Sequence, residues 1–160
     1  MKAFFINRYG DNSVLQFGEI KKPEMGDYDV LVKVHSASVN PLDLKIQDGS
    51  LKVLLPYKFP IILGNDFSGV VENIGKSVKK FKIGDEVYGK TEQVRTGSFS
   101  EFLSIKETYL AKIPRNLTME ESASIPLVGL TAWQVLVERA KLKKGQKVFI
   151  QAGSGGVGSV

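Results

Sequence analysis

Two groups of residues in this sequence are of types that could do chemistry, and the first is the glycine-rich run at 153–158, Gly-Ser-Gly-Gly-Val-Gly. The run fits the pattern G-x-G-x-x-G and follows a strand-like stretch at 147–152. Glycines at this spacing let the backbone turn sharply and approach a pyrophosphate, which the N–H groups of a following helix can bind. A P-loop would require Lys and then Ser or Thr after the last glycine, but Ser159 and Val160 stand there. The pattern therefore indicates either a dinucleotide-phosphate site or a flexible tail.

The second group is Asn40 and Asp43, which lie in the stretch 38–49, Ser-Val-Asn-Pro-Leu-Asp-Leu-Lys-Ile-Gln-Asp-Gly. This stretch is rich in turn-forming residues, so we expect a loop between strands, where polar groups that bind or catalyse often lie. Asn and Asp side chains also bond nearby backbone N–H groups in Asx turns, and Pro41 stiffens such a turn. The residues alone leave a functional and a structural role open.

Composition limits the chemistry further. The 160 residues include no Cys and a single His, His35, whereas zinc sites are built largely from thiolates and imidazoles. We therefore expect no metal site, and no spacing suggests a triad partner for His35. The net charge of +5 is dispersed in short groups of Lys, which argues against a nucleic-acid partner. No apolar run reaches membrane-spanning length and no secretory signal is recognisable, so we expect a soluble, cytoplasmic protein without a membrane partner.

The elements that must position these residues are mostly short strands. Apolar and β-branched runs bounded by Gly, Pro, Asn or Asp predict strands at 2–6, 14–23, 29–39, 68–75, 84–90, 97–105 and 109–114. Asp66 and Asp85 are expected in turns between strands. Short strands at this spacing predict a mainly β fold, a compact and partly open β-barrel with a few helices.

A helical pattern begins after this β-rich part. Thr118 followed by Glu121 is a capping box that predicts a helix start, and Pro126 breaks or kinks that helix. The stretch 127–142 carries apolar residues on a broad helical face, with Trp133 expected in the core or at a domain junction.

The last part of the chain changes pattern again, because 147–152 predicts a buried strand that leads into the glycine run. We therefore divide the chain into 1–117 and 118–160. The second part has the order of a βα nucleotide-binding unit, but a complete βαβ unit takes about 30 residues or more. We expect the chain to be a fragment of a longer protein.

Four stretches together resemble the medium-chain dehydrogenase/reductase superfamily, specifically its zinc-independent quinone oxidoreductase branch. They occur in the family's order and cover essentially the whole chain: VNPLDLKIQDG at 39–49, the stretch from LGNDFSG to GDEVYG at 63–89, LVGLTAWQVL at 127–136 and VFIQAGSGGVG at 148–158. Zinc alcohol dehydrogenases of this superfamily have Cys where Asn40 stands here and Gly-His-Glu where Gly64-Asn65-Asp66 stands. Without a zinc ion to polarise a carbonyl oxygen, reduction of an already conjugated carbonyl is favoured over chemistry on simple alcohols.

The resemblance implies a GroES-like catalytic barrel over 1–117, followed over 118–160 by the truncated start of an α/β Rossmann domain. The implied activity is NAD(P)H-dependent hydride transfer to quinones or α,β-unsaturated carbonyls, with the chain alone inactive. The implied site residues are Asn40 beside the nicotinamide, Asp43 ordering the loop around it, and Thr131 near the cofactor. The implied pyrophosphate-binding residues are Gly153, Gly155, Gly156, Val157 and Gly158.

Other functions stay open. A related reductase could act on an enoyl-thioester or an aldehyde, and a non-catalytic binding module could reuse the barrel, because a fold does not determine its function. We favour NADPH over NADH, although the discriminating residue lies about 20 positions beyond the glycine run. The expected partners are a small-molecule quinone or enone and, for the full-length protein, a second copy in a homodimer.

Overall fold

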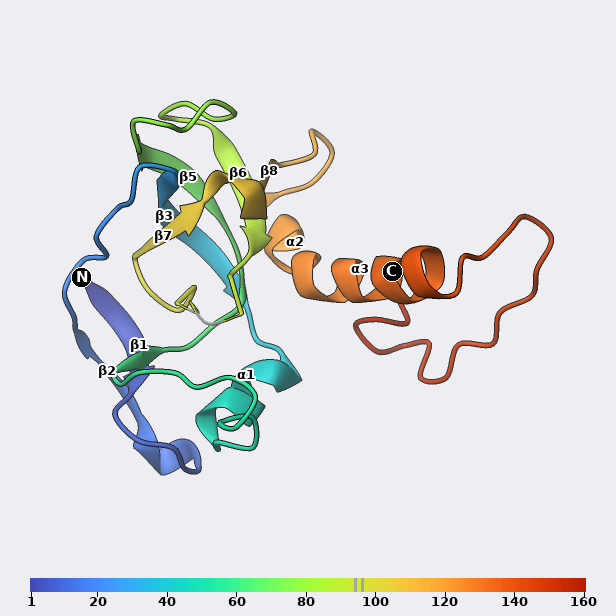
Figure 1. The fold of residues 1–160 in the computed structure, drawn as a ribbon, viewed down its shortest axis with the longest axis horizontal. Coiled ribbons are helices and arrows are strands. Elements are labelled where there is room, and N and C mark those ends of the chain that lie inside the picture. Colours follow the sequence, from blue (N-terminus) through green and yellow to red (C-terminus); the bar gives the residue numbers. More distant parts are fainter. Residues whose placement is uncertain (94, 96) are drawn as a thin grey trace.

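Two antiparallel β-sheets form the first part of the molecule in this computed structural model, which describes residues 1–93, 95 and 97–160 (Figure 1). The strand order is β2-β1-β4 in one sheet and β7-β3-β5-β6-β8 in the other. The strands are β1 Lys2–Ile6, β2 Leu15–Glu19, β3 Asp29–Ser38, β4 Ile61–Ile62, β5 Asp66–Ile74, β6 Glu86–Lys90, β7 Phe102–Lys106 and β8 Leu110–Lys112. A bridge between Ala3 and Ser100 connects the sheets. The predicted mainly β, partly open architecture is confirmed.

The helices are short and lie at one end of the sheets. They are α1 Pro41–Gln47, α2 Met119–Ala123 and α3 Pro126–Trp133, and a π-helical segment, Gln134–Arg139, continues α3. Single 3-10 turns occur at Asn12–Val14 and Glu107–Tyr109. Figure 1 shows α2 next to the sheets and α3 extending away from them. Residues 141–160 form turns and irregular loops. Among the described helices, none is long and apolar enough to cross a membrane.

Two apolar clusters hold the β-rich part together. The larger lies within the five-stranded sheet and includes Val30, Val32, Phe67, Val71, Phe81, Val87, Leu103 and Ile105. The smaller lies between β1, β4 and α1 and includes Ile6, Val14, Ile46, Ile61 and Leu63. Burial of this apolar surface supplies the main favourable free energy of folding. Lys33 and His35 on β3 are exposed while Val30 and Val32 are buried, which is typical of a strand with one face on the core.

The pairing of β3 with β5 depends on a glycine. Gly69 pairs with Val34 next to an irregularity in the register. A Cβ atom at Gly69 would lie 2.2 Å from the Lys33 carbonyl oxygen, closer than any side chain tolerates. Only glycine therefore lets these two backbones approach here.

Two predicted elements are wrong. The stretch 38–49 is not a loop, because Pro41–Gln47 is the helix α1. Residues 147–152 are not a buried strand either: no strand is assigned there, and Phe149 is 92% exposed. The physical reason is that a strand needs a neighbour to take its backbone N–H and C=O groups, and no described strand runs beside this stretch.

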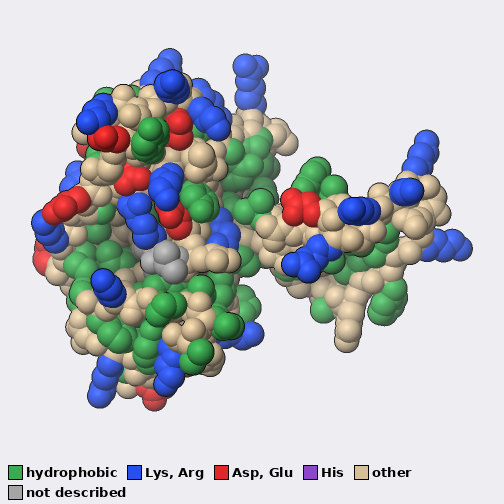
Figure 2. Space-filling model, viewed as in Figure 1, with side chains coloured by type: hydrophobic (Ala, Val, Ile, Leu, Met, Phe, Trp, Pro, Cys, Tyr) green, Lys and Arg blue, Asp and Glu red, His purple; other side chains and the backbone are tan. Residues whose placement is uncertain are grey.

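Lys and Arg side chains are spread over the surface rather than gathered in one patch on the face drawn in Figure 2. The same figure shows apolar side chains along the extended helical part. Exposed apolar residues there include Leu130, Trp133, Val135 and Val137. Trp133 is thus exposed and does not lie in a core formed by the described residues, whereas its expected place at a domain junction stays a prediction.

Candidate functional site at the junction of the barrel and α3

Asn40 and Asp43 sit at the beginning of α1, immediately after β3. Asn40 is the N-cap residue, and its extended backbone turns the chain from strand into helix. Its backbone N–H donates to Asp43 Oδ2 at 2.7 Å, which is the returning half of a capping box. Pro41 occupies the first helical position, where no N–H is needed. Asn40 and Asp43 are both buried, so the helix start holds two polar side chains in the protein interior.

The Asn40 side chain is directed at Asp66 rather than at its own helix. Asn40 Nδ2 donates to Asp66 Oδ2 at 3.0 Å, and the Ser38 hydroxyl donates to the same oxygen at 3.3 Å. Asp66 is the first residue of β5 and is 0% exposed. The predicted turn at Asp66 is therefore the start of a strand, and no local pattern around Asp66 predicts its contact with Asn40.

A second buried branch of the network runs through Asn65. Asn65 Nδ2 donates to Asp43 Oδ1 at 2.7 Å, and the Thr91 hydroxyl contacts Asn65 Oδ1 at 3.4 Å. Asn65 follows Gly64, which has φ of +97°; a Cβ atom there would lie 2.2 Å from Ser98 Oγ. Glycine therefore makes the turn that places Asn65 and Asp66 side by side.

Burial sets the protonation behaviour of the site. It raises the pKa of Asp66 to about 6, although hydrogen bonds from Asn40, Leu127 and Ser38 and the Lys90 charge act in the opposite direction. Burial likewise raises the pKa of Asp43, and it lowers the pKa of Lys90 despite the attraction of both carboxylates. Two carboxyl groups and one ammonium group thus share a poorly solvated region.

Asp66 also connects this site to α3. The backbone N–H of Leu127 donates to Asp66 Oδ1 at 3.0 Å. One turn further along α3, the Thr131 hydroxyl donates to the Leu127 carbonyl oxygen at 2.7 Å. The structure therefore links Asn40, Asp66 and Thr131 through a short series of hydrogen bonds around Leu127.

The glycine run lies against α3 in a series of turns. The Gly155 N–H donates to the Ala152 carbonyl oxygen at 2.9 Å, and the Ser159 N–H donates to that of Gly155 at 3.0 Å. A Cβ atom at Gly156 would lie 3.0 Å from Val128 Cγ1. Gly153 and Gly158 are close enough that a Cβ atom at Gly158 would touch Gly153 Cα at 2.7 Å. Gly153, Gly155, Gly156, Val157 and Gly158 are thus beside the helix of Thr131, without the strand before and the helix after that a dinucleotide cradle uses.

His35 lies outside this hydrogen-bond network. His35 is exposed, and its Nδ1 lies 3.7 Å from Glu120 Oε1. Among the described residues, no group of three or more His, Cys, Asp or Glu side chains is placed to hold a metal ion. At the positions where zinc enzymes have Cys and His, the amide nitrogens of Asn40 and Asn65 donate to carboxylates. This donor set does not fit zinc, which prefers thiolate and imidazole ligands.

Comparison with known proteins identifies the family. Residues 26–115 match the alcohol dehydrogenase GroES-like domain, and the chain belongs to this family. It is 37% identical to the mitochondrial NAD(P)H oxidoreductase RTN4IP1 of Bos taurus over 99% of this chain and 45% of that protein. It is 36% identical to the chloroplastic quinone-oxidoreductase homolog of Spinacia oleracea over 99% of this chain and 50% of that protein.

Solved structures agree with this assignment. The quinone oxidoreductase from Coxiella burnetii is 35% identical with a TM-score of 0.88, over 99% of this chain and 51% of that one. The mycobacterial protein Rv1454c complexed with NADPH is 30% identical with a TM-score of 0.87, over 99% and 47%. The chain spans about half the length of the relatives it matches. The predicted resemblance to quinone oxidoreductases of the medium-chain superfamily is confirmed.

The same comparisons correct the expected location. The cytoplasmic assignment is wrong, because the relatives just described are a mitochondrial and a chloroplastic oxidoreductase. The assignment relied on the absence of a secretory signal and of cysteine, and neither feature separates the cytosol from an organelle interior.

Proposed function

We propose that the full-length protein is an NAD(P)H-dependent oxidoreductase that reduces quinones or α,β-unsaturated carbonyls without zinc. The observation that carries the proposal is the buried contact between Asn40 and Asp66 at the start of α3, in a chain of the alcohol dehydrogenase GroES-like family. Relatives named as NAD(P)H and quinone oxidoreductases support the reaction class. The hydrogen-bonded amides where a zinc enzyme has its ligands support the zinc-independent form.

The residue types fit a nicotinamide dinucleotide. Asn40 offers a planar amide at the start of α1 and Thr131 a hydroxyl on α3. Gly155, Gly156 and Val157 offer a stretch of backbone whose two glycines carry no side chain. A bound reduced nicotinamide would supply the hydride. The chain's own residues would position the cofactor: Asn40 binds beside the nicotinamide ring, and Asp43 keeps α1 and Asn40 in place. Water supplies the proton that the substrate takes up after the hydride.

The titratable groups also suit this chemistry. Asp43 and Asp66 accept hydrogen bonds from Asn65 and Asn40, which keeps both carboxylates away from the substrate and fixes the amides. We propose NADPH over NADH, which the NADPH complex of a mycobacterial relative supports, and a homodimer as the assembly.

The test is a steady-state assay of the full-length protein with NADPH or NADH and a panel of one quinone, one enone, one enoyl-thioester and one simple aldehyde. We expect the quinone and enone to be reduced, and Asn40→Ala to lower kcat by about tenfold or more. The matched control is Asn7→Ala, because Asn7 is an exposed asparagine bonded to Gln16 and should leave kcat unchanged.

Binding is measured separately. Either nucleotide should raise the melting temperature of the full-length protein, since a ligand that binds only the native state stabilises it. No shift and no turnover with both nucleotides would instead indicate a binding module. Unchanged kinetics in Asn40→Ala would remove Asn40 from the site, and light scattering decides between a monomer and a dimer.

A further inference from the structure

Asp66 divides its two carboxylate oxygens between two parts of the molecule. Oδ2 accepts from the Ser38 hydroxyl at the end of β3 and from Asn40 Nδ2 at the N-cap of α1. Oδ1 accepts from the backbone N–H of Leu127, in the first turn of α3. One side chain therefore contacts the residue expected beside the nicotinamide and the helix that carries Thr131.

The contact with Asn40 determines the orientation of that amide. A carboxylate can only accept hydrogen bonds, so the Asn40 nitrogen must face Asp66. Because the amide group is planar, Asn40 Oδ1 then points to the opposite side. A neutral amide at position 66 would remove this restriction, since it can face Asn40 with either its oxygen or its nitrogen.

The contact with Leu127 determines where α3 begins. The N-cap residue of α3, Ile125, makes no side-chain capping bond, and Pro126 has no N–H to donate. The Leu127 N–H is one of the helix-start donors that lack an intrahelical acceptor, and Asp66 provides the acceptor from β5. The Asp66 carboxylate therefore holds the first turn of α3 and also orients the Asn40 amide.

We propose that Asp66 is a positioning residue, which orients the Asn40 amide and holds α3, and with it Thr131, at a set place relative to Asn40. This inference rests on the proposed function. Asp66 itself is fully buried and touches Asn40 and the backbone of α3, so it acts through these groups and not on the substrate.

The matched control is Asp29, a second buried aspartate of the barrel. Like Asp66, it accepts from one backbone N–H, one serine hydroxyl and one side-chain nitrogen, here of Gly26, Ser104 and Arg95. Asp29→Asn therefore repeats the chemical change of Asp66→Asn at a place that contacts neither Asn40 nor α3.

Kinetics of the full-length protein provide the first measurement. We expect Asp66→Asn to lower kcat by about tenfold while the nucleotide KM changes less than about threefold, because misplacing a reacting group affects turnover more than binding. Adding Asp66→Asn to Asn40→Ala should lower kcat little further, since Asp66 acts through Asn40. Asp29→Asn should retain wild-type kcat. A kcat within twofold of wild type in Asp66→Asn, or effects of Asp66→Asn and Asn40→Ala that multiply, would overturn the proposal.

Side-chain amide NMR provides a measurement independent of activity. In the wild type, the Asn40 Nδ2 protons should exchange slowly and shift when Ser38→Ala removes the neighbouring hydroxyl. They should exchange rapidly in Asp66→Asn and remain protected in Asp29→Asn. Unprotected Asn40 protons in the wild type would overturn the contact itself. If the wild type proved inactive while these protons were protected, the proposed function would fail and the Asp66–Asn40 contact would stand.

Discussion

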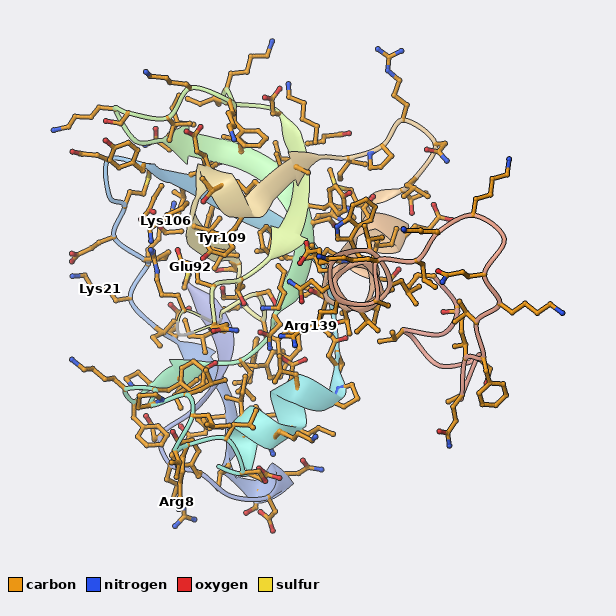
Figure 3. The ribbon with its side chains drawn as sticks, turned by 45° about the vertical axis from the view of Figure 1, so that its right-hand side comes forward. Arg8, Lys21, Glu92, Lys106, Tyr109 and Arg139 are labelled. Carbon is orange, nitrogen blue, oxygen red and sulfur yellow. The ribbon has the colours of Figure 1, made fainter. Side chains whose placement is uncertain are left out.

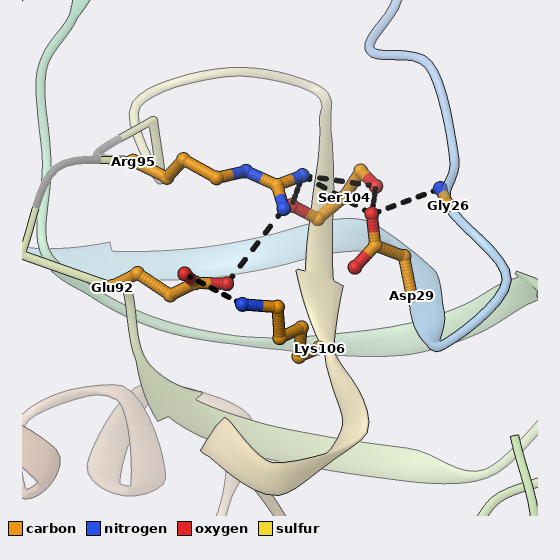
Figure 4. Close-up of polar contacts among 6 residues, drawn as sticks. All are labelled: Gly26, Asp29, Glu92, Arg95, Ser104 and Lys106. Atoms are coloured by element: carbon orange, nitrogen blue, oxygen red, sulfur yellow. Dashed lines mark hydrogen bonds and ion pairs between the residues drawn. The ribbon is translucent and has the colours of Figure 1, made fainter.

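Asp29 and Asp66 are two buried aspartates of one barrel with the same number and kind of hydrogen-bond donors, yet their ionisation differs. Asp29 Oδ2 accepts from Gly26 N at 3.0 Å, Ser104 Oγ at 3.1 Å and Arg95 Nη2 at 3.3 Å, as Figure 4 shows. Asp66 accepts from Leu127 N at 3.0 Å, Ser38 Oγ at 3.3 Å and Asn40 Nδ2 at 3.0 Å. Asp29 has a guanidinium partner where Asp66 has an amide, and the donors of Asp29 share one oxygen whereas those of Asp66 are divided between both.

The pKa values of the two carboxyl groups shift in opposite directions. Burial acts to raise the pKa of Asp29, but the Gly26 hydrogen bond and the Arg95 guanidinium outweigh it and hold the pKa below its ordinary value. Burial raises the pKa of Asp66 to about 6, because neutral donors and a more distant Lys90 do not offset it. The direction of each pKa therefore depends on whether the hydrogen bonds and nearby charges outweigh the effect of burial, as they do at Asp29 and do not at Asp66.

The surroundings of Asp29 reinforce this contrast. Arg95 Nη1 lies 3.7 Å from Glu92 Oε1, and Glu92 Oε2 lies 3.4 Å from Lys106 Nζ. Figure 3 shows Glu92 and Lys106 close together beside the sheet, and Figure 4 shows alternating charges from Lys106 to Asp29. The Asp29 region is a balanced ion network that fastens a loop to β3, whereas the Asp66 carboxylate has no ion pair with any described residue and only the Lys90 charge acts on it from further away.

The largest expected difference between the two aspartates is in the pH dependence of stability. Because the pKa of Asp66 is raised from 3.8 to about 6, the folded state holds this proton more tightly than the unfolded state. Its contribution to the free energy of unfolding is therefore present below about pH 4 and falls by about 3 kcal/mol as the pH rises to about 6. Urea titrations between about pH 4 and pH 6 should show this fall in the free energy of unfolding in the wild type and not in Asp66→Asn.

For Asp29 the sign is opposite. Its lowered pKa gives stability that is present above its ordinary pKa and is lost as the pH falls through the lowered value. Asp29→Asn should therefore reduce the loss of stability in acid. If both variants changed the pH profile in the same direction, the contrast drawn from the donors would be wrong.

The next largest effect is on stability at neutral pH. Asp29→Asn leaves Arg95 without its anion, and because the Arg95 side chain is 41% exposed, the cost should be about 2 kcal/mol rather than that of a fully buried pair. Asp66→Asn removes a buried charge without such a partner and should change the free energy of unfolding by less than about 1 kcal/mol. Chemical denaturation at pH 7 measures both, and a larger loss in Asp66→Asn would contradict the comparison.

The smallest effects are at the two serines. Ser104→Ala should lower the free energy of unfolding by about 1 kcal/mol, since it removes a buried hydroxyl bonded to an anion. Ser38→Ala should cost less, because its bond to Asp66 is longer and only partly buried. Thermal melts of both variants measure these losses of stability, and Ser159→Ala, at an exposed serine, is the reference variant. A larger cost at Ser38 would mean that the Asp66 carboxylate is a stronger acceptor than its surroundings indicate.

Local patterns in the sequence predict the strands well and α1 poorly. Alternation along 29–39 and the glycine boundaries depend on neighbours within a few residues, so β3, β5 and β6 were expected close to where they lie. The helix α1 has seven residues, too few for an apolar period to be visible. Its one local signal is Asn40-Pro41 with Asp43 two residues on, which matches the N-cap, first and third positions of a helix.

The sequence points to candidate site residues by their type but not to the hydrogen bonds that connect them. Asn40 and Asp43 stand out by residue type, but the partners of Asp66 lie 26, 28 and 61 residues away in sequence. Hydrogen bonds over such separations depend on how the sheet folds back on itself, which no local pattern encodes. The exposed stretch 147–152 teaches the same lesson, since an apolar composition predicts burial only where another element lies against it.

Trp133 has one more consequence. It is the sole tryptophan of the chain, it lies at the end of α3, two residues beyond Thr131, and it is 57% exposed. An indole in water fluoresces at longer wavelength than a covered one, and reduced nicotinamide absorbs light where tryptophan emits. Trp133 is therefore an optical reporter on α3. A shift of its emission to shorter wavelength would report that another element has packed against α3, and a loss of its fluorescence intensity would report that a reduced dinucleotide has bound.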